Sequence, residues 1–125
     1  MHSERPKERQ TRFVAKLLTS DLLSWEETAD TDAFQAKLDK FVVQVARRFE
    51  NFDNEPYYGV LLFNSSGRLL EEIYPGQLDS ALFQELTGLS KDSGLESLFE
   101  RARRDALNVD AALDEATKDL DRYRF

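Results

Sequence analysis

Residues 57–74, YYGVLLFNSSGRLLEEIY, constrain the fold of this chain more than any other stretch. An apolar run, Gly59–Phe63, leads into the polar tetrapeptide Asn64–Gly67, and a second run with apolar residues leads away from it. Asn and Gly tolerate the positive φ that a hairpin turn with a G1-type bulge requires. A run as apolar as GVLLF is buried on most of its surface, which indicates a strand inside a sheet. The sequence therefore predicts a β-hairpin that other segments flank and cover.

The length and composition of the chain fit one ordinary domain. It has 125 residues, 41% of them hydrophobic and 33% charged, which is enough for one core and too few for two. We expect a disordered N-terminus over residues 1–5 and a single domain over residues 6–125. No apolar run approaches the roughly 18 residues of a membrane helix. The first ten residues, MHSERPKERQ, precede no apolar segment of the kind found in a signal peptide.

The charge and the absence of cysteine make several functions improbable. The formal net charge is −7, so we expect neither nucleic acid nor membrane as a partner, because phosphate binding uses clustered Lys and Arg. Without cysteine there is no disulfide framework and no thiolate metal site, which favours a cytoplasmic location. Residues 1–20 carry five basic and two acidic side chains. A solvated basic helix face explains this segment most simply, and an arm that docks on an acidic partner is the alternative.

Residues 33–49 contain the main ambiguity. From Phe34 to Phe49 the apolar spacings of four, three, one, three and four fit an amphipathic helix with Asp32 as its N-cap. The same residues fit a hairpin with a two-residue turn at Asp39-Lys40, although this dipeptide is not a favoured hairpin turn. In the hairpin the opposed residues on one face are Leu38 and Phe41, Ala36 and Val43, and Phe34 and Val45.

The preceding segment, LLSWEET, supports the hairpin. A turn after it brings Trp25 opposite Ala36, on the same face as the other apolar residues. Three strands then agree on one apolar side, and the run FVVQV is rich in β-branched residues. We therefore favour strands for residues 33–49, with a helix as the alternative. We also predict that Trp25 lies on the core face with Phe34 and Val43.

The remaining segments alternate between polar breaks and helical stripes. Residues 50–56 are expected to form a loop and residues 91–94, KDSG, a linker. Apolar spacing predicts helices from about Pro6 to Thr19, over residues 78–86, and over residues 95–120. The last stretch fits two helices or one bent helix, with Asn108 as a left-handed C-cap and Asp110 as a new N-cap.

These elements define an α+β fold. We expect an N-terminal helix, an antiparallel meander of about five strands, and two or three C-terminal helices packed on one face of the sheet. This order of elements is typical of a small bacterial domain, and it does not assign a family.

The sequence contains no recognisable catalytic or metal-binding constellation. The only histidine, His2, lies in the segment expected to be disordered, which argues against a His-based triad or zinc site. The pairs Glu26-Glu27 and Glu71-Glu72 are adjacent on expected strands and point to opposite faces, so neither forms a dyad. The acidic segments 30–32 and 53–55 lack the spacing of a calcium loop. We therefore predict no catalytic residue, no cofactor and no metal site.

Two further groups of residues have a structural and a functional interpretation. Arg101, Arg103 and Arg104 are interleaved with Glu100 and Asp105, which favours a helix surface with ion pairs over a phosphate site. Four aromatic residues could stack on a ligand, but we expect most of them in the core; they are Trp25, Tyr57, Tyr58 and Tyr74.

These observations favour binding over catalysis. We predict a small acidic, non-enzymatic protein-interaction domain whose partner is another protein or a second copy of itself. It would use a sheet edge or the C-terminal helices, where residues 109–120 extend an apolar stripe beyond the needs of a small sheet. The alternative is a small-molecule-binding protein or a carboxylate-dependent enzyme with a pocket between sheet and helices. A flat apolar patch would support the first function, and a pocket with convergent polar groups the second.

Overall fold

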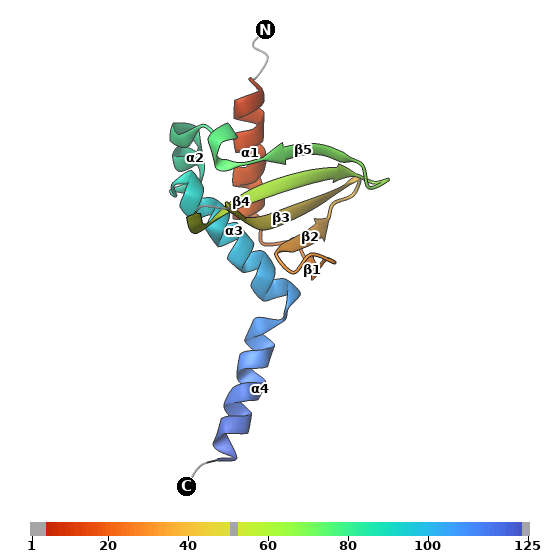
Figure 1. Ribbon diagram of the computed structural model, residues 1–125, viewed down its shortest axis with the longest axis vertical. Coiled ribbons are helices and arrows are strands. Elements are labelled where there is room, and N and C mark those ends of the chain that lie inside the picture. The colour runs from red at the N-terminus through yellow and green to blue at the C-terminus, as the bar shows by residue number, and fades with distance from the viewer. Residues whose placement is uncertain (1–4, 51–52, 124–125) are drawn as a thin grey trace.

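A computed structural model of the chain describes residues 5–50 and 53–123. These residues form the expected α+β fold, with one N-terminal helix, a five-stranded antiparallel sheet and three C-terminal helices (Figure 1). The strands follow one another across the sheet as a meander. They are β1 (Trp25–Glu27), β2 (Ala33–Lys37), β3 (Phe41–Glu50), β4 (Asp53–Asn64) and β5 (Leu69–Ile73). The helices are α1 (Pro6–Thr19), α2 (Ser80–Thr87), α3 (Lys91–Ala106) and α4 (Val109–Asp121), with a short 3-10 turn, η1 (Pro75–Gln77), before α2.

The ambiguous segment is a hairpin, in the register that the sequence predicts. Phe34 lies opposite Val45, and the backbone N–H of Leu38 donates to the carbonyl of Phe41 at 2.8 Å across the turn. Trp25 lies opposite Ala36 of β2 and is only 6% exposed. It belongs to the same buried cluster as Phe34 and Val43, so its predicted place on the core face is confirmed. Strands are favoured here because they place one apolar face of three segments on a single side.

The hairpin of residues 57–74 is also confirmed. β4 lies between β3 and β5, and Val60 is fully buried. Gly67 has φ 86°, and its N–H donates to the carbonyl of Asn64 at 3.0 Å. The Asn64 side-chain oxygen accepts from the backbone N–H groups of Ser66 and Arg68. Asn64 therefore fixes the turn through its side chain, and Gly67 supplies the left-handed residue.

The loop predicted over residues 50–56 is wrong at Glu50 and at residues 53–56, and residues 51–52 lie outside the described residues. β3 and β4 extend into this segment from both sides, and Pro56 lies inside β4 opposite Phe49. β5 pairs only with Val60–Phe63, so at Pro56 one side of β4 has no strand partner among the described residues. Proline is compatible with such a position, because its missing N–H removes no ladder hydrogen bond.

The linker predicted over residues 91–94 is wrong as well. α3 begins at Lys91, and the hydroxyl oxygen of Ser90 caps it by accepting from the N–H of Ser93 at 3.2 Å. Gly94 is buried where α3 crosses the earlier helices, and a Cβ there would lie 2.4 Å from the ring of Phe83. The glycine thus allows two helices to approach closely, and it does not mark a flexible segment.

The C-terminal segment consists of two helices that meet at Asn108. This residue has φ 54° and ψ 46°, the left-handed conformation that the sequence predicts. α4 begins directly after it, so Asn108 also holds the N-cap position that we expected at Asp110. Asp110 lies instead in the first turn of α4, where a carboxylate interacts favourably with the helix dipole.

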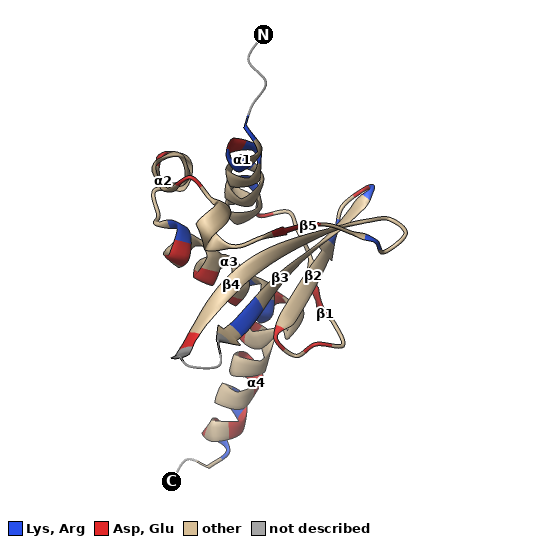
Figure 2. Cartoon of the chain, turned by 45° about the horizontal axis from the view of Figure 1, so that its top comes forward, with Lys and Arg blue, Asp and Glu red and all other residues tan. Residues whose placement is uncertain are grey.

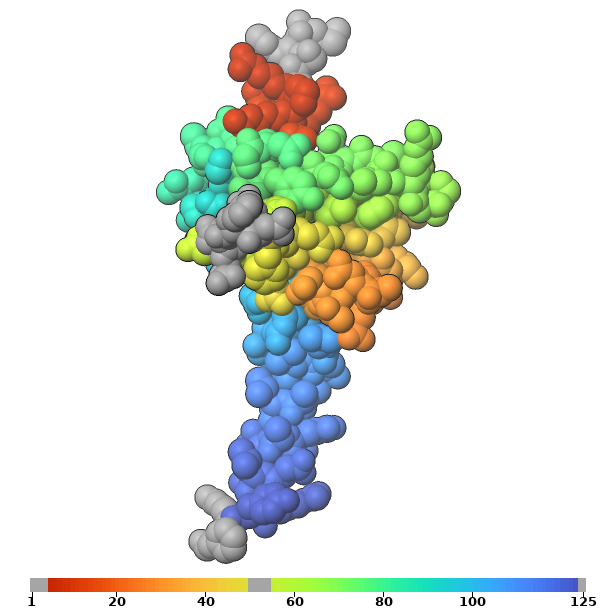
Figure 3. Space-filling view, in the orientation of Figure 1, coloured from red at the N-terminus to blue at the C-terminus, as the bar shows by residue number. Residues whose placement is uncertain are grey.

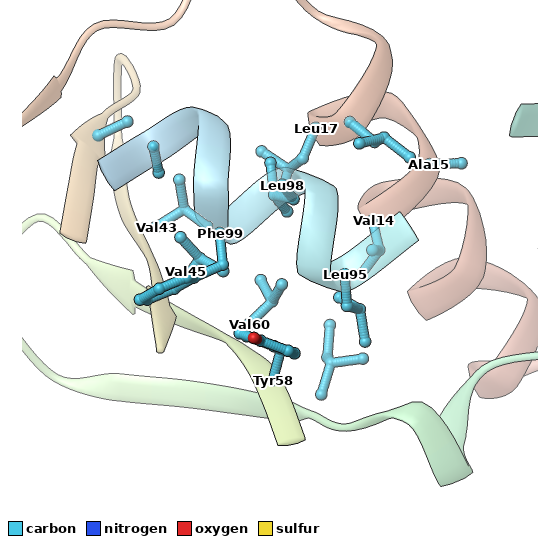
Figure 4. Close-up of a cluster of buried hydrophobic side chains, with 14 of the residues drawn as sticks. Val14, Ala15, Leu17, Val43, Val45, Tyr58, Val60, Leu95, Leu98 and Phe99 are labelled. Carbon is cyan, nitrogen blue, oxygen red and sulfur yellow. The ribbon is translucent and has the colours of Figure 1, made fainter. Parts of the chain in front are cut away.

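The core lies between the sheet and the helices α1 and α3 (Figure 4). Phe99 of α3 is at its centre, with ring centroids 5.5 Å from Phe34 and 5.3 Å from Tyr58. Thr11 is fully buried and accepts the backbone N–H of Asp79 at 2.9 Å, which joins α1 to the start of α2. Helices α1 and α3 therefore cover one face of the sheet, and the other face has no helix among the described residues.

Candidate interaction surface

α4 stands apart from the rest of the molecule (Figures 1 and 3). Every residue of this helix after Val109 is exposed. Its large apolar side chains are exposed as well: Leu113 by 54% and Leu120 by 70%, followed by Tyr123 at 72%. The described part of the chain thus presents an amphipathic helix whose apolar stripe is in contact with water.

In the sequence, the apolar spacing of α4 continues that of α3 across the break between the two helices at Asn108. Spacings of four and three residues connect the whole series, which is Leu95, Phe99, Ala102, Ala106, Val109, Leu113, Ala116, Leu120 and Tyr123. The first three are fully buried against the core, whereas the members in α4 have no such cover. We call Val109, Leu113, Ala116, Leu120 and Tyr123 the α4 stripe. This heptad spacing is typical of a helix that packs against another surface.

The contacts that α4 makes within the chain are local and polar. At the junction with α3, Arg104 Nη2 lies 2.5 Å from Asp110 Oδ1. Within α4, the hydroxyl of Thr117 donates to the carbonyl of Leu113 at 2.8 Å. Helices shorter than about 12–15 residues are marginal in water without tertiary packing. A helix of 13 residues is therefore expected to gain stability from a partner surface.

A second surface with apolar side chains lies on the sheet, on the side away from the helices, where Gln44 and Glu72 both pair with Leu61 and interrupt the apolar residues. Because side chains alternate along β3 and β4, those of Val42, Leu61 and Phe63 point to the face of the sheet opposite the core. Leu69 of β5 pairs with Phe63 and is 42% exposed. Leu61 packs here in a small second cluster with Ala33, Ala46 and Phe63. We call the apolar residues Val42, Ala46, Tyr57, Leu61, Phe63 and Leu69 the open sheet face.

Two tyrosines extend the open sheet face at one end of β4. The rings of Tyr57 and Tyr74 are 5.8 Å apart, and Tyr74 lies so close to Gly59 that a Cβ there would be 2.4 Å from its Cε1. Burial raises the pKa of Tyr74 above its ordinary value. Of the four aromatic residues expected in the core, Trp25 and Tyr58 are buried there, whereas this tyrosine pair lies outside it.

The acidic residues considered for catalysis or metal binding take structural roles or face solvent. Glu26, Glu27, Glu71 and Glu72 are all exposed. Asp30 accepts the backbone N–H of Asp32 at 2.9 Å and a guanidinium N–H of Arg48 at 2.9 Å, and these bonds lower the pKa of Asp30. The side chains of residues 53 and 54 lie outside the described set. Within that set, no group of three or more His, Asp or Glu side chains could hold a metal ion.

The arginine cluster of α3 is a set of structural contacts. Arg101 donates to the backbone carbonyls of Leu18 and Ser20, where α1 ends. Arg103 pairs with Glu100 at 3.5 Å, and Arg104 pairs with Asp110. A shallow hollow of about 490 Å³ lies beside these residues, but its charged groups already have partners in the chain. The space expected for a small-molecule pocket, between sheet and helices, is filled by the side chains of the core.

The two edges of the sheet offer little for strand pairing. β1 has three residues, and β5 has five with a register irregularity opposite Leu62 and Phe63. Short and bulged edge strands resist pairing with another chain. Of the two routes that the sequence predicts for association, the C-terminal helices therefore have the stronger structural basis.

Comparisons of the chain with protein-family models, with curated proteins and with solved structures find no match. None of the helices in the described residues is both long and apolar enough to span a membrane. The sequence identified the α4 stripe, but reasoning from the sequence missed the open sheet face. A signal was present, since Val60–Phe63 is apolar at every position and a strand of this kind has two apolar faces.

Proposed function

We propose that this chain is a non-enzymatic protein-interaction domain that binds a partner protein through α4. The exposed α4 stripe carries the proposal, because it presents Leu113 and Leu120 on a helix without tertiary cover, with Tyr123 exposed in the turn that follows. The cysteine-free sequence supports placing this function in the cytoplasm.

Energetics support a partner for this helix. Full burial of a leucine side chain contributes about 1.5–3 kcal/mol relative to exposure. Leu113 and Leu120 together therefore offer several kcal/mol to a surface that covers them, in addition to the stabilisation of a marginal helix. Amphipathic helices commonly bind by laying such a row of side chains into an apolar groove of another protein.

A matched pair of substitutions in α4 tests the proposal. Leu113→Asp places a charge in the stripe, and Ala111→Asp places the same charge on the opposite side of the same helix. We expect Leu113→Asp to abolish association with partner proteins, measured by light scattering and by affinity capture, and Ala111→Asp to retain it. Because α4 is not part of the core, both variants should melt within a few degrees of the parent chain. If Leu113→Asp strongly destabilises the isolated monomer, the stripe is an internal contact and the proposal is wrong.

A further inference from the structure

We infer that the partner of α4 is the open sheet face of a second copy of this chain. In the resulting two-fold dimer each α4 covers the sheet of the other copy. This inference rests on the proposed function and names the partner surface. Two surfaces of the same chain support it, because the α4 stripe is exposed and no helix among the described residues covers the open sheet face. On that face Tyr57 and Leu69 are exposed, whereas Ala46 and Leu61 are buried among the side chains of neighbouring strands.

The two surfaces match in length. The stripe runs from Val109 to Tyr123, about 20 Å at 1.5 Å per residue. On β4 the side chains that point away from the helices run from Tyr57 to Phe63, also about 20 Å at 3.3 Å per residue. A helix laid along β4 can therefore contact the whole apolar row.

The area available distinguishes this exchange from a simple pairing of two α4 helices. A helix of 13 residues, about 20 Å long and about 10 Å wide, has a footprint of roughly 200 Å². One helix–helix contact buries this footprint once on each partner, which is well below the roughly 1,200–2,000 Å² of a specific protein–protein interface. A reciprocal exchange contains two such contacts and therefore buries twice the area of a single helix–helix contact.

The shape of the molecule is compatible with this symmetry. α4 projects from one end, with α1 at the opposite end and the sheet beside α3 (Figure 2). A two-fold axis perpendicular to the long axis places α4 of each copy beside the sheet of the other. Both contacts are then identical and the assembly closes as a dimer, which is the commonest symmetry of homo-oligomers.

A groove between α1 and α2 is the competing surface. It has a volume of about 260 Å³, and its lining includes the basic residues Arg12 and Lys16 together with Leu86. Its charge complements α4, which has five acidic residues and one basic residue between Val109 and Asp121. The open sheet face is favoured because the groove offers a single large apolar side chain, and exposed ion pairs contribute less than the burial of leucines.

Charge-swap complementation tests the exchange. Leu113→Asp alters the α4 stripe, and Leu69→Lys alters the open sheet face at a side chain that is 42% exposed. Leu22→Lys serves as the control for the lysine, because Leu22 is 94% exposed and lies outside both surfaces. We expect the parent chain and the control to dimerise in a light-scattering concentration series, reaching twice the chain mass of 14.5 kDa. Each of the other two variants should raise the dimer dissociation constant more than about tenfold.

Mixing the two weakened variants should restore the dimer. One contact of the mixed dimer then contains only parent residues, and the other opposes the new aspartate and the new lysine. Restoration supports the exchange. If Leu69→Lys leaves the dimer intact, the exchange is wrong and helix–helix pairing is favoured. If Lys16→Glu dissociates the dimer, the exchange is wrong and the groove is favoured. A parent chain that stays monomeric overturns the second copy as partner while leaving α4 as a binding element. Destabilisation of the monomer by Leu113→Asp overturns both proposals.

Discussion

Replacing Gly94 with alanine should destabilise this protein, although alanine is the better helix former. Gly94 lies in the first turn of α3, where helix propensity alone favours Ala by about 1 kcal/mol. A methyl group there would lie 2.4 Å from both Cε1 and Cζ of Phe83 and 3.3 Å from Cδ2 of Leu18. Ordinary contacts of a Cβ are 3.4–4 Å, so the ring would have to move by about 1 Å.

The surroundings oppose that movement. Phe83 is fully buried and Leu18 is 6% exposed, so the ring cannot turn toward solvent. Overpacking of a core typically costs about 1–3 kcal/mol, and two close contacts place this site in the upper half of that range. After the gain in helix propensity, we expect a net loss of about 1–2 kcal/mol in the free energy of unfolding. At roughly 4 °C per kcal/mol, the melting temperature falls by about 4–8 °C.

Urea denaturation followed by circular dichroism measures this change, with a double-mutant cycle as the decisive comparison. Ser97→Ala, at an exposed position of the same helix, is the control and should be neutral or slightly stabilising. Phe83→Leu removes the ring, so Gly94→Ala in that background should lose most of its cost. Stabilisation by Gly94→Ala in the parent chain would refute the close helix approach, and equal costs in both backgrounds would place the strain elsewhere.

Three other changes test single contacts of the fold. Arg101→Met removes the donors to the carbonyls at the end of α1 and should lower the free energy of unfolding by about 1–3 kcal/mol in urea denaturation. Arg103→Met removes only an exposed ion pair with Glu100 and should have little effect in the same assay. Thr11→Val leaves the N–H of Asp79 without its acceptor and should lower the free energy of unfolding by about 1–3 kcal/mol in the same assay. An unchanged urea midpoint would contradict this prediction. Burial raises the pKa of Tyr58, so the unfolded chain ionises first and stability falls as the pH rises above about 10. Melting curves between pH 9 and 11 should show this loss in the parent chain and a smaller loss in Tyr58→Phe.

The sequence by itself determined the sheet. Alternation of side chains along three segments set one register, and the structure pairs Trp25, Phe34 and Val45 with the partners that this register requires. Turn chemistry did the same for the central hairpin through Asn64 and Gly67. These features are readable because a strand repeats every two residues, and a shift by one residue would move every apolar side chain to the wrong face.

Only the tertiary structure decided which surfaces are covered. Gly94 resembled a linker residue because nothing local shows that Phe83 will lie against it. Pro56 resembled a loop residue because its place in β4 depends on how far β5 extends along the neighbouring edge. Periodicity marks the α4 stripe as apolar, and the unbroken apolar run Val60–Phe63 marks the open sheet face, but neither pattern says whether the chain itself buries these residues. Burial depends on contacts between residues far apart in sequence, and α3 already occupies the face of the sheet that a further helix would need.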